Sequence, residues 1–226
     1  MTLMDLLPFA ILGAFLGLDV VSFPQAMISR PIVASTVAGA FAGDAERGLA
    51  VGAVLEVVAL GTLPFGASRY PEWGSAAVVG GALHAVGTAA PVGSFALAVL
   101  GALMVAWVSG ESMVVVRKLN GQWIRAGRAR IDAGQSDEVT RIQLRGLVAD
   151  FVRGALVTGV CLALLAPAHL VLGATWEGNA ITERLALACI VAGFGAATTW
   201  MLVRGTAGAR AGVVAGLAIG LLLVVL

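Results

Sequence analysis

Residues 51–61 read VGAVLEVVALG, an apolar run that holds a single acid, Glu56, near its centre. An ionised carboxylate is costly in hydrocarbon, so an acid that persists there faces a partner, a cavity or a substrate. Three interpretations of Glu56 are open: it lines a polar cavity, it is locked to an arginine or a backbone amide, or it carries protons in an ion-driven carrier. Each of them depends on whether the chain lies in a membrane.

The composition predicts a membrane protein. Of the 226 residues, 59% are hydrophobic and 12% are charged, and the mean hydropathy is +0.97. Soluble domains carry about 25% charged residues, so this chain has too little polar surface to cover a globule in water. The net charge of +1 gives no reason to expect nucleic acid as a partner. The first residues lack a basic start and a cleavage site, so we expect a retained membrane segment and no secretory signal.

Apolar segments of two kinds divide the chain. A helix needs about 20 apolar residues to cross a bilayer, and candidates of suitable length lie at residues 3–21, 91–116, 146–172 and 181–203. The short or interrupted candidates lie at residues 31–42, 48–67, 75–90 and 212–226. Interrupted segments mark the binding sites of transporters. The sequence therefore predicts an all-α, polytopic integral membrane protein, with broken or re-entrant helices in its N-terminal half and a site between Asp19 and His84.

Charge divides the chain into an N-terminal membrane region at residues 1–116, a basic loop at 117–145 and a C-terminal membrane region at 146–226. The loop holds seven of the fourteen Lys and Arg residues and only three acids. A basic loop of this length between apolar segments is expected to stay in the cytoplasm. The interspersed acids, Asp132, Asp137 and Glu138, disfavour the alternative of a nucleic-acid or anionic-lipid patch.

Glycines recur four residues apart, a spacing that puts them on one helix face and favours close packing between helices. The pairs are Gly13/Gly17, Gly39/Gly43 and Gly48/Gly52, and the C-terminal run is Gly208, Gly212, Gly216 and Gly220. The C-terminal run fits either a subunit interface or packing within the chain. Glu56 continues the face of Gly48 and Gly52, so we expect its carboxylate to look into a space between helices.

Four polar side chains of the N-terminal half are predicted to share one cavity. Asp19 ends the first apolar segment, Gln25 and Arg30 lie in the linker that follows, and Glu56 lies in the interrupted segment beyond. Carboxylates suit sugars because each oxygen accepts hydrogen bonds from neighbouring hydroxyls. For Arg30, an interfacial anchor or an ion-pair partner is an equally good interpretation.

The remaining polar and thiol groups fit structural roles. We expect Asp44 to cap a helix, His84 to be a hydrogen-bonded packing histidine, and Glu111 to face the cytoplasmic interface. Cys161 and Cys189 lie in apolar segments and are expected to be buried thiols. No phosphate-binding GxxxxGK[ST] sequence, Cys/His cluster or nucleophile elbow occurs. We therefore predict no catalytic residue, metal or cofactor, and a reactive group would come from another polypeptide.

An ordered set of short motifs between residues 17 and 81 is more specific than any one of them alone. The set comprises Leu18-Asp19, Gln25, Arg30-Pro31, Gly43-Asp44, Gly48, Gly52, Leu55-Glu56, Leu60-Gly61, Gly66-Ala67 and Pro71-Glu72. With these motifs the chain resembles the membrane subunit IIC of the mannose/fructose/sorbose family of the phosphoenolpyruvate-dependent phosphotransferase system (PTS). The rest of the chain agrees with that family in hydropathy and length.

The resemblance implies a multi-pass sugar permease in the bacterial cytoplasmic (inner) membrane. It implies a second membrane subunit, IID, and a trimer of IIC–IID pairs whose mobile core moves against a fixed scaffold. A hexose would be translocated and then phosphorylated by the soluble subunit IIB, which carries phosphate on a histidine, and the basic loop would face IIB. IIC itself would carry no phosphohistidine. The implied sugar-binding residues are Glu56, Asp19, Gln25, Arg30, Gly61 and Gly66.

Two other functions remain compatible with these residues. The first is a non-transporting membrane protein that keeps the permease fold and acts through interactions, because fold does not fix function. The second is an ion-coupled carrier that uses Glu56 as its proton site.

Overall fold

The computed structural model describes residues 3–62, 69–87, 91–175 and part of the stretch 179–219. These parts of the chain contain helices and no strand, so the prediction of an all-α membrane protein is confirmed. The helices are α1 (Leu3–Asp19), α2 (Pro31–Phe41), α3 (Ala45–Leu60), α4 (Trp73–Val86), α5 (Pro91–Asp132) and α6 (Ser136–Ala174).

Local chemistry explains where the short helices begin. Pro31 opens α2, since its fixed φ suits a first helical position and its missing N–H would have had no partner there. Asp44 caps α3 by accepting a 3.0 Å hydrogen bond from the Arg47 backbone N–H, as predicted. Glu72 caps α4 through the backbone N–H groups of Gly74 and Ser75. These caps keep α2, α3 and α4 as separate short elements.

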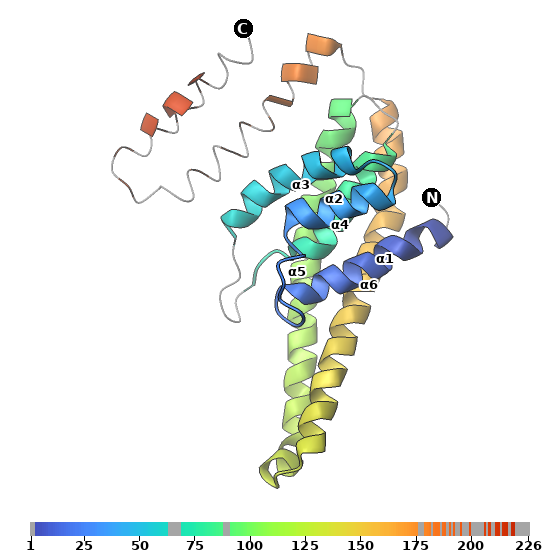
Figure 1. Ribbon diagram of the computed structural model, residues 1–226, viewed down its shortest axis with the longest axis vertical. Coiled ribbons are helices and arrows are strands. Elements are labelled where there is room, and N and C mark those ends of the chain that lie inside the picture. Colours follow the sequence, from blue (N-terminus) through green and yellow to red (C-terminus); the bar gives the residue numbers. More distant parts are fainter. Residues whose placement is uncertain are drawn as a thin grey trace.

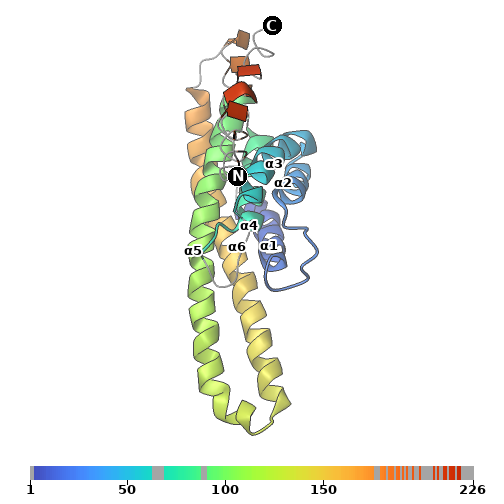
Figure 2. The ribbon, with the colours of Figure 1, turned by 90° about the vertical axis from the view of Figure 1, so that its left-hand side faces the viewer.

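The two longest helices form a hairpin. At 1.5 Å per residue, the 42 residues of α5 and the 39 of α6 extend about 60 Å each, twice the thickness of the hydrocarbon core. Both are long and apolar enough to cross a membrane. In Figure 1 they run side by side along the long axis, and Figure 2 shows the same pair from the side.

The structure differs from the sequence expectation at residues 117–145. These residues are helical on both sides of a short turn: α5 continues to Asp132, residues 133–135 form the turn, and α6 begins at Ser136. Gly134 makes the turn possible with a φ of +76°, a conformation that favours glycine. We call residues 117–145 the hairpin tip. Its cytoplasmic location stays a prediction.

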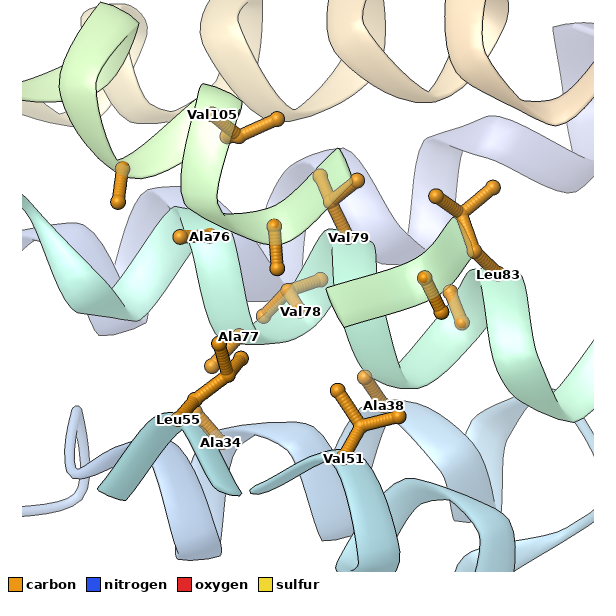
Figure 3. Packing of buried hydrophobic residues seen from close by; sticks show 14 of the residues in the cluster. Ala34, Ala38, Val51, Leu55, Ala76, Ala77, Val78, Val79, Leu83 and Val105 are labelled. Carbon is orange, nitrogen blue, oxygen red and sulfur yellow. The ribbon is translucent and has the colours of Figure 1, made fainter. Parts of the chain in front are cut away.

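The four short helices form a layer against the end of the hairpin that lies away from its turn (Figure 1). There α1 packs on α6, α2 packs on α3 and α4, and α4 packs on α5. Helix α4 is the centre of this layer, because every residue from Trp73 to His84 is buried. Figure 3 shows its valines and alanines between residues of the other helices, including Leu55 of α3 and Val105 of α5.

Glycines bring α2 and α3 into backbone contact, as their spacing predicted. A Cβ atom added at Gly39 would lie 2.7 Å from the Gly48 Cα, and one at Gly52 would lie 2.8 Å from the Pro31 carbonyl oxygen. Gly43 instead serves the turn between the helices, with a φ of +98° and open space around it. A Cβ atom added at Gly212 would meet no other part of the described chain within 4 Å, so both interpretations of the C-terminal glycines remain open.

The short segments expected around the site occur as short helices. Helix α2 has 11 residues and α4 has 14, too few to cross about 30 Å of hydrocarbon alone. In Figure 1, α1, α2 and α3 run across the long axis of the hairpin. The predicted spans 181–203 and 212–226 fall largely outside the described residues, as does the interruption at Pro64.

Candidate functional site

A pocket of about 350 Å³ opens between the linker of residues 20–30 and the ends of α2, α3 and α4. We call it the site pocket. Its lining residues are Asp19, Val20, Gln25, Met27, Ser29, Arg30, Pro31, Ala59, Thr62 and Trp73. The structure therefore brings three of the predicted site residues, Asp19, Gln25 and Arg30, to one cavity. Gly61 ends α3 beside the lining residue Thr62, and Gly66 lies outside the described residues.

Asp19 holds the linker in place. Its carboxylate accepts hydrogen bonds from the backbone N–H of Ala26 at 2.7 Å and from the backbone N–H and hydroxyl of Ser29 at 2.9 and 2.8 Å. The side chain is 1% exposed. A buried carboxylate is stable only when such donors replace water. Asp19 thus forms the wall of the site pocket by closing the linker onto the end of α1.

The linker carries two unusual backbone conformations. Gln25 and Met27 have φ values of +61° and +60°, in the left-handed region that side-chain-bearing residues rarely adopt. The Gln25 side-chain amide donates to the carbonyl of Val21 at 3.2 Å, which leaves its own carbonyl oxygen for another donor. Strained backbone of this kind persists where surrounding bonds impose it, and it concentrates at functional sites.

Glu56 is paired with Arg30. The two side chains form an ion pair, and the Glu56 carboxylate also accepts the Ile32 backbone N–H at 3.2 Å. Glu56 thereby satisfies a free N–H at the start of α2, where the helix dipole favours negative charge. The interpretation that it is locked to an arginine and a backbone amide is therefore correct for this conformation.

The Arg30–Glu56 pair is not dry, because the two side chains are 29% and 18% exposed. Arg30 lines the site pocket, whereas Glu56 is not among the lining residues and contacts Arg30. The expectation that Glu56 looks into a space above Gly48 and Gly52 is wrong, because α2 fills that space: its Ser35 hydroxyl donates to the Gly48 carbonyl at 2.8 Å. The carboxylate reaches the pocket through its arginine instead.

Trp73 is a pocket residue that sequence reasoning missed. Its indole N–H donates to the Thr62 hydroxyl at 3.1 Å, and both side chains line the site pocket. The indole offers an apolar face beside the charged groups. The sequence could have pointed to Trp73, because it directly follows Pro71-Glu72, the last motif of the set that resembles the family.

A buried charge network beneath the linker was also missed. Arg153 donates to Asp150 at 2.6 Å and to the Ser109 hydroxyl at 2.8 Å, and Ser109 donates to Glu72 at 2.5 Å. The second oxygen of Asp150 accepts the Ser22 hydroxyl at 2.7 Å. This last bond attaches the linker to α6. The network thus joins α4, α5 and α6 to the wall of the site pocket.

His84 is buried and hydrogen-bonded, as expected of a packing histidine. Its Nδ1 lies 2.9 Å from the Ser94 hydroxyl, which lies 3.3 Å from Nε2 of His169. Arg47 closes the same end of α4 by donating to the Gly87 carbonyl at 2.6 Å. The sequence showed His84 alone on its segment, whereas the fold places the other histidine of the chain beside it.

The other assigned residues lie away from the site pocket. Glu111 is exposed and pairs with Arg69 at 3.1 Å. Cys161 is partly buried, and Cys189 lies outside the described residues. Within the described ranges, no three His, Cys, Asp or Glu side chains form a group that could hold a metal ion.

The site pocket combines the groups that polyol recognition uses. Asp19 forms the wall, Gln25 supplies an acceptor, Arg30 supplies donors, and Trp73 supplies an apolar face. Its volume falls within the range of small-molecule sites, about 300–1,000 Å³. The chemistry of the lining is therefore that of a binding site for a small, hydroxyl-rich molecule.

Solved structures of membrane proteins share this fold. One, described as a structure of a membrane protein, has a TM-score of 0.72 at 20% identity and covers 90% of this chain and 80% of its own. A second, the mannose transporter ManYZ in complex with microcin E492, has a TM-score of 0.62 at 20% identity, with coverages of 92% and 78%. At this identity the likeness concerns the fold alone.

Sequence comparison gives the family. The sorbose-specific EIIC component of the PTS from Klebsiella pneumoniae is 38% identical over 58 residues, which are 26% of this chain and 22% of that protein. A family model described as the PTS sorbose-specific IIC component matches residues 3–207. That match spans nearly the whole chain. This protein therefore belongs to the family of sorbose-specific IIC components of the phosphotransferase system.

Proposed function

We propose that this chain is the sugar-conducting IIC subunit of a PTS permease in a bacterial cytoplasmic membrane, and that the site pocket binds a hexose. The observation that carries the proposal is the Arg30–Glu56 pair at the edge of a pocket lined by Asp19, Gln25 and Trp73. All of these residues except Trp73 belong to the motif set that resembles the family.

The ion pair suggests how a sugar is recognised. Hydrogen bonds to charged groups are stronger than those between neutral groups. A sugar hydroxyl can accept from Arg30 and donate to Glu56, so a polyol entering the pocket would bridge the two side chains and satisfy both. The apolar face of the sugar ring would then lie against Trp73. In this proposal Glu56 binds sugar only after its bond to Arg30 opens.

The partners proposed for the family would occupy two further surfaces. One face of α6 presents exposed apolar side chains at every fourth position: Leu144, Val148, Val152, Leu156, Val160 and Leu164. This stripe suits lipid or a membrane subunit such as IID. The hairpin tip carries the arginines that would meet IIB, which would phosphorylate the sugar. A trimer of IIC–IID pairs would complete the assembly.

The test is sugar binding by the purified IIC–IID complex. Glu56→Gln should raise the dissociation constant about tenfold or more, because a charge-assisted bond worth about 1.5–3 kcal/mol is lost. Glu46→Gln is the matched control, since Glu46 lies on the same helix and is exposed. Equal binding by both variants would remove Glu56 from the site.

Transport assays separate the remaining functions. Uptake by a PTS permease requires phosphoenolpyruvate, whereas an ion-coupled carrier that uses Glu56 would continue without it and stop when the proton gradient collapses. A regulatory protein that keeps the fold would support neither kind of uptake while still binding its membrane partner.

A further inference from the structure

A groove of about 530 Å³ lies at the base of the hairpin tip and shares no lining residue with the site pocket. We call it the cationic groove. Its lining residues are Arg69, Val114, Arg117, Lys118, Gly121, Gln122 and Arg125. All but Arg69 come from α5, at steps of one, three or four residues that keep to one side of the helix. Four basic side chains therefore converge on one concave surface.

The four basic side chains of the groove differ in whether they form an ion pair or a cation–π contact. Arg69 pairs with Glu111 at 3.1 Å, and Arg117 stacks on the Tyr70 ring with its guanidinium carbon 4.9 Å from the ring centre. Lys118 and Arg125 are exposed, and neither forms an ion pair within the described residues. The groove thus has four positive charges against the single negative charge of Glu111.

The three acids of the hairpin tip do not neutralise the groove: Asp137 lies in the first turn of α6, beside the turn of the hairpin, and the other two acids are paired. Asp132 pairs with Arg128 at 3.5 Å, and Glu138 pairs with Arg130 at 3.2 Å and Arg141 at 3.0 Å. All of these pairs lie nearer the turn. The interspersed acids had disfavoured an anionic-lipid patch at the sequence level, but the fold places the paired acids and the groove in different parts of the hairpin.

The groove continues an exposed apolar stripe along α5. Leu100, Met104 and Trp107 are 57%, 63% and 61% exposed, and Val115 is 57% exposed. The stripe then becomes cationic at the same three- and four-residue steps: Leu100, Met104, Trp107, Glu111, Val115, Lys118, Gln122, Arg125. Apart from Glu111, which is paired with Arg69, this helix face therefore passes from apolar to cationic within a few turns, and an anionic phospholipid passes from apolar chains to a negative headgroup over a similar length.

We propose that the cationic groove binds the phosphate of an anionic phospholipid whose acyl chains lie along the exposed stripe of α5. Basic pockets beside membrane helices favour anionic headgroups. Arg125 is turned back toward the membrane end of the groove, because its Nη1 lies 3.5 Å from the position a Cβ would take on Gly121. Long basic side chains reach toward the lipid interface in this way. The bound lipid would fix the depth of the hairpin in the bilayer.

The test titrates phosphatidylglycerol into the purified full-length chain in detergent and counts bound lipids by native mass spectrometry. Lys118→Gln/Arg125→Gln should raise the apparent dissociation constant for phosphatidylglycerol about tenfold, since each basic residue contributes about fivefold at most. Arg128→Gln/Arg145→Gln is the control, because it removes two positive charges from the same hairpin outside the groove. Lys118→Arg/Arg125→Lys keeps the charge and should keep the affinity.

Several results would overturn the proposal. Equal losses in the two glutamine variants would mean that net charge, and no particular site, attracts the lipid. Equal affinity for phosphatidylcholine would exclude recognition of an anionic headgroup. Displacement of the lipid by millimolar inorganic phosphate would assign the groove to a soluble phosphate. All four exchanged residues are exposed, so the helical content by circular dichroism should be the same in every variant.

Discussion

At the scale of single residues, Asp19 and the linker it holds determine the shape of the site pocket. Three hydrogen bonds to Ala26 and Ser29 stabilise a segment in which Gln25 and Met27 adopt left-handed backbone conformations. Each such conformation costs about 1 kcal/mol or more for a residue with a side chain. The bonds of Asp19 therefore offset strain that the linker would otherwise release.

Asp19→Asn should loosen the linker. The amide keeps one acceptor and brings two donors toward the N–H groups of the linker, so at least one hydrogen bond to a charged group is lost, worth about 1.5–3 kcal/mol. We expect faster hydrogen exchange at residues 20–30 and about tenfold weaker sugar binding by the IIC–IID complex. Asp137→Asn, at an exposed position of the hairpin tip, should leave both quantities unchanged. An unaltered exchange rate in Asp19→Asn would contradict the role given to this carboxylate.

Met27→Gly tests the strain itself. Glycine adopts a φ near +60° without the steric penalty of a side chain. Met27 is 75% exposed, so little packing is lost. We expect an unchanged or slightly higher Tm in detergent, whereas Met27→Val should lower the Tm. The order of the two variants is the decisive observation, and a lower Tm for the glycine variant would count against strain at this position.

At the scale of the helices, the sequence was informative about apolar segments and less so about charged ones. Hydropathy located the ends of α2 to within one residue and those of α4 to within four residues, because the apolar character is lost near caps or glycine there. It failed at residues 117–145, where charge was taken as the sign of a loop. Arginine, lysine, glutamine and alanine are good helix formers, and no proline occurs between residues 117 and 145 to interrupt them.

Gly39→Ala should disrupt the contact between α2 and α3. Its Cβ would lie 2.6 Å from the Asp44 carbonyl oxygen and 2.7 Å from the Gly48 Cα, and neither backbone atom can move independently. Overpacking of this kind costs about 1–3 kcal/mol or more, so the Tm should fall clearly. Gly121→Ala is the control, because its nearest neighbour is the flexible end of Arg125 at 3.5 Å and alanine favours helix. A Tm in Gly39→Ala as high as in the control would contradict backbone contact.

At the scale of the whole molecule, the buried network links the site to the hairpin. The sequence indicated the residues of the motif set, but it could not show that Arg30 meets Glu56 or that Ser22 meets Asp150. Those pairs are 26 and 128 residues apart in the chain. Such contacts arise from the packing of α1 and α2 against the other helices, and that packing cannot be predicted from a single sequence. For the same reason Trp73 and Arg153 were not predicted.

Arg153→Gln should be among the most destabilising single changes. It leaves Glu72 and Asp150, both buried, without their cation, and breaking a buried pair in this way costs about 3–5 kcal/mol. Arg145→Gln removes the same charge from an exposed position and should have little effect on the Tm. Adding Glu72→Gln and Asp150→Asn to Arg153→Gln should recover part of the loss. If Arg153→Gln is as stable as Arg145→Gln, the network does not hold the helices together.

The continuous hairpin has a practical consequence for imaging. The part of α5 from residue 117 to Asp132 is about 24 Å long, and in Figure 2 it stands clear of the layer of short helices together with its antiparallel neighbour. In a particle embedded in a detergent belt, this pair forms a thin rod that extends beyond the layer of short helices. The rod can serve as a fiducial mark. Even a low-resolution projection would then show the orientation of the molecule relative to the detergent belt.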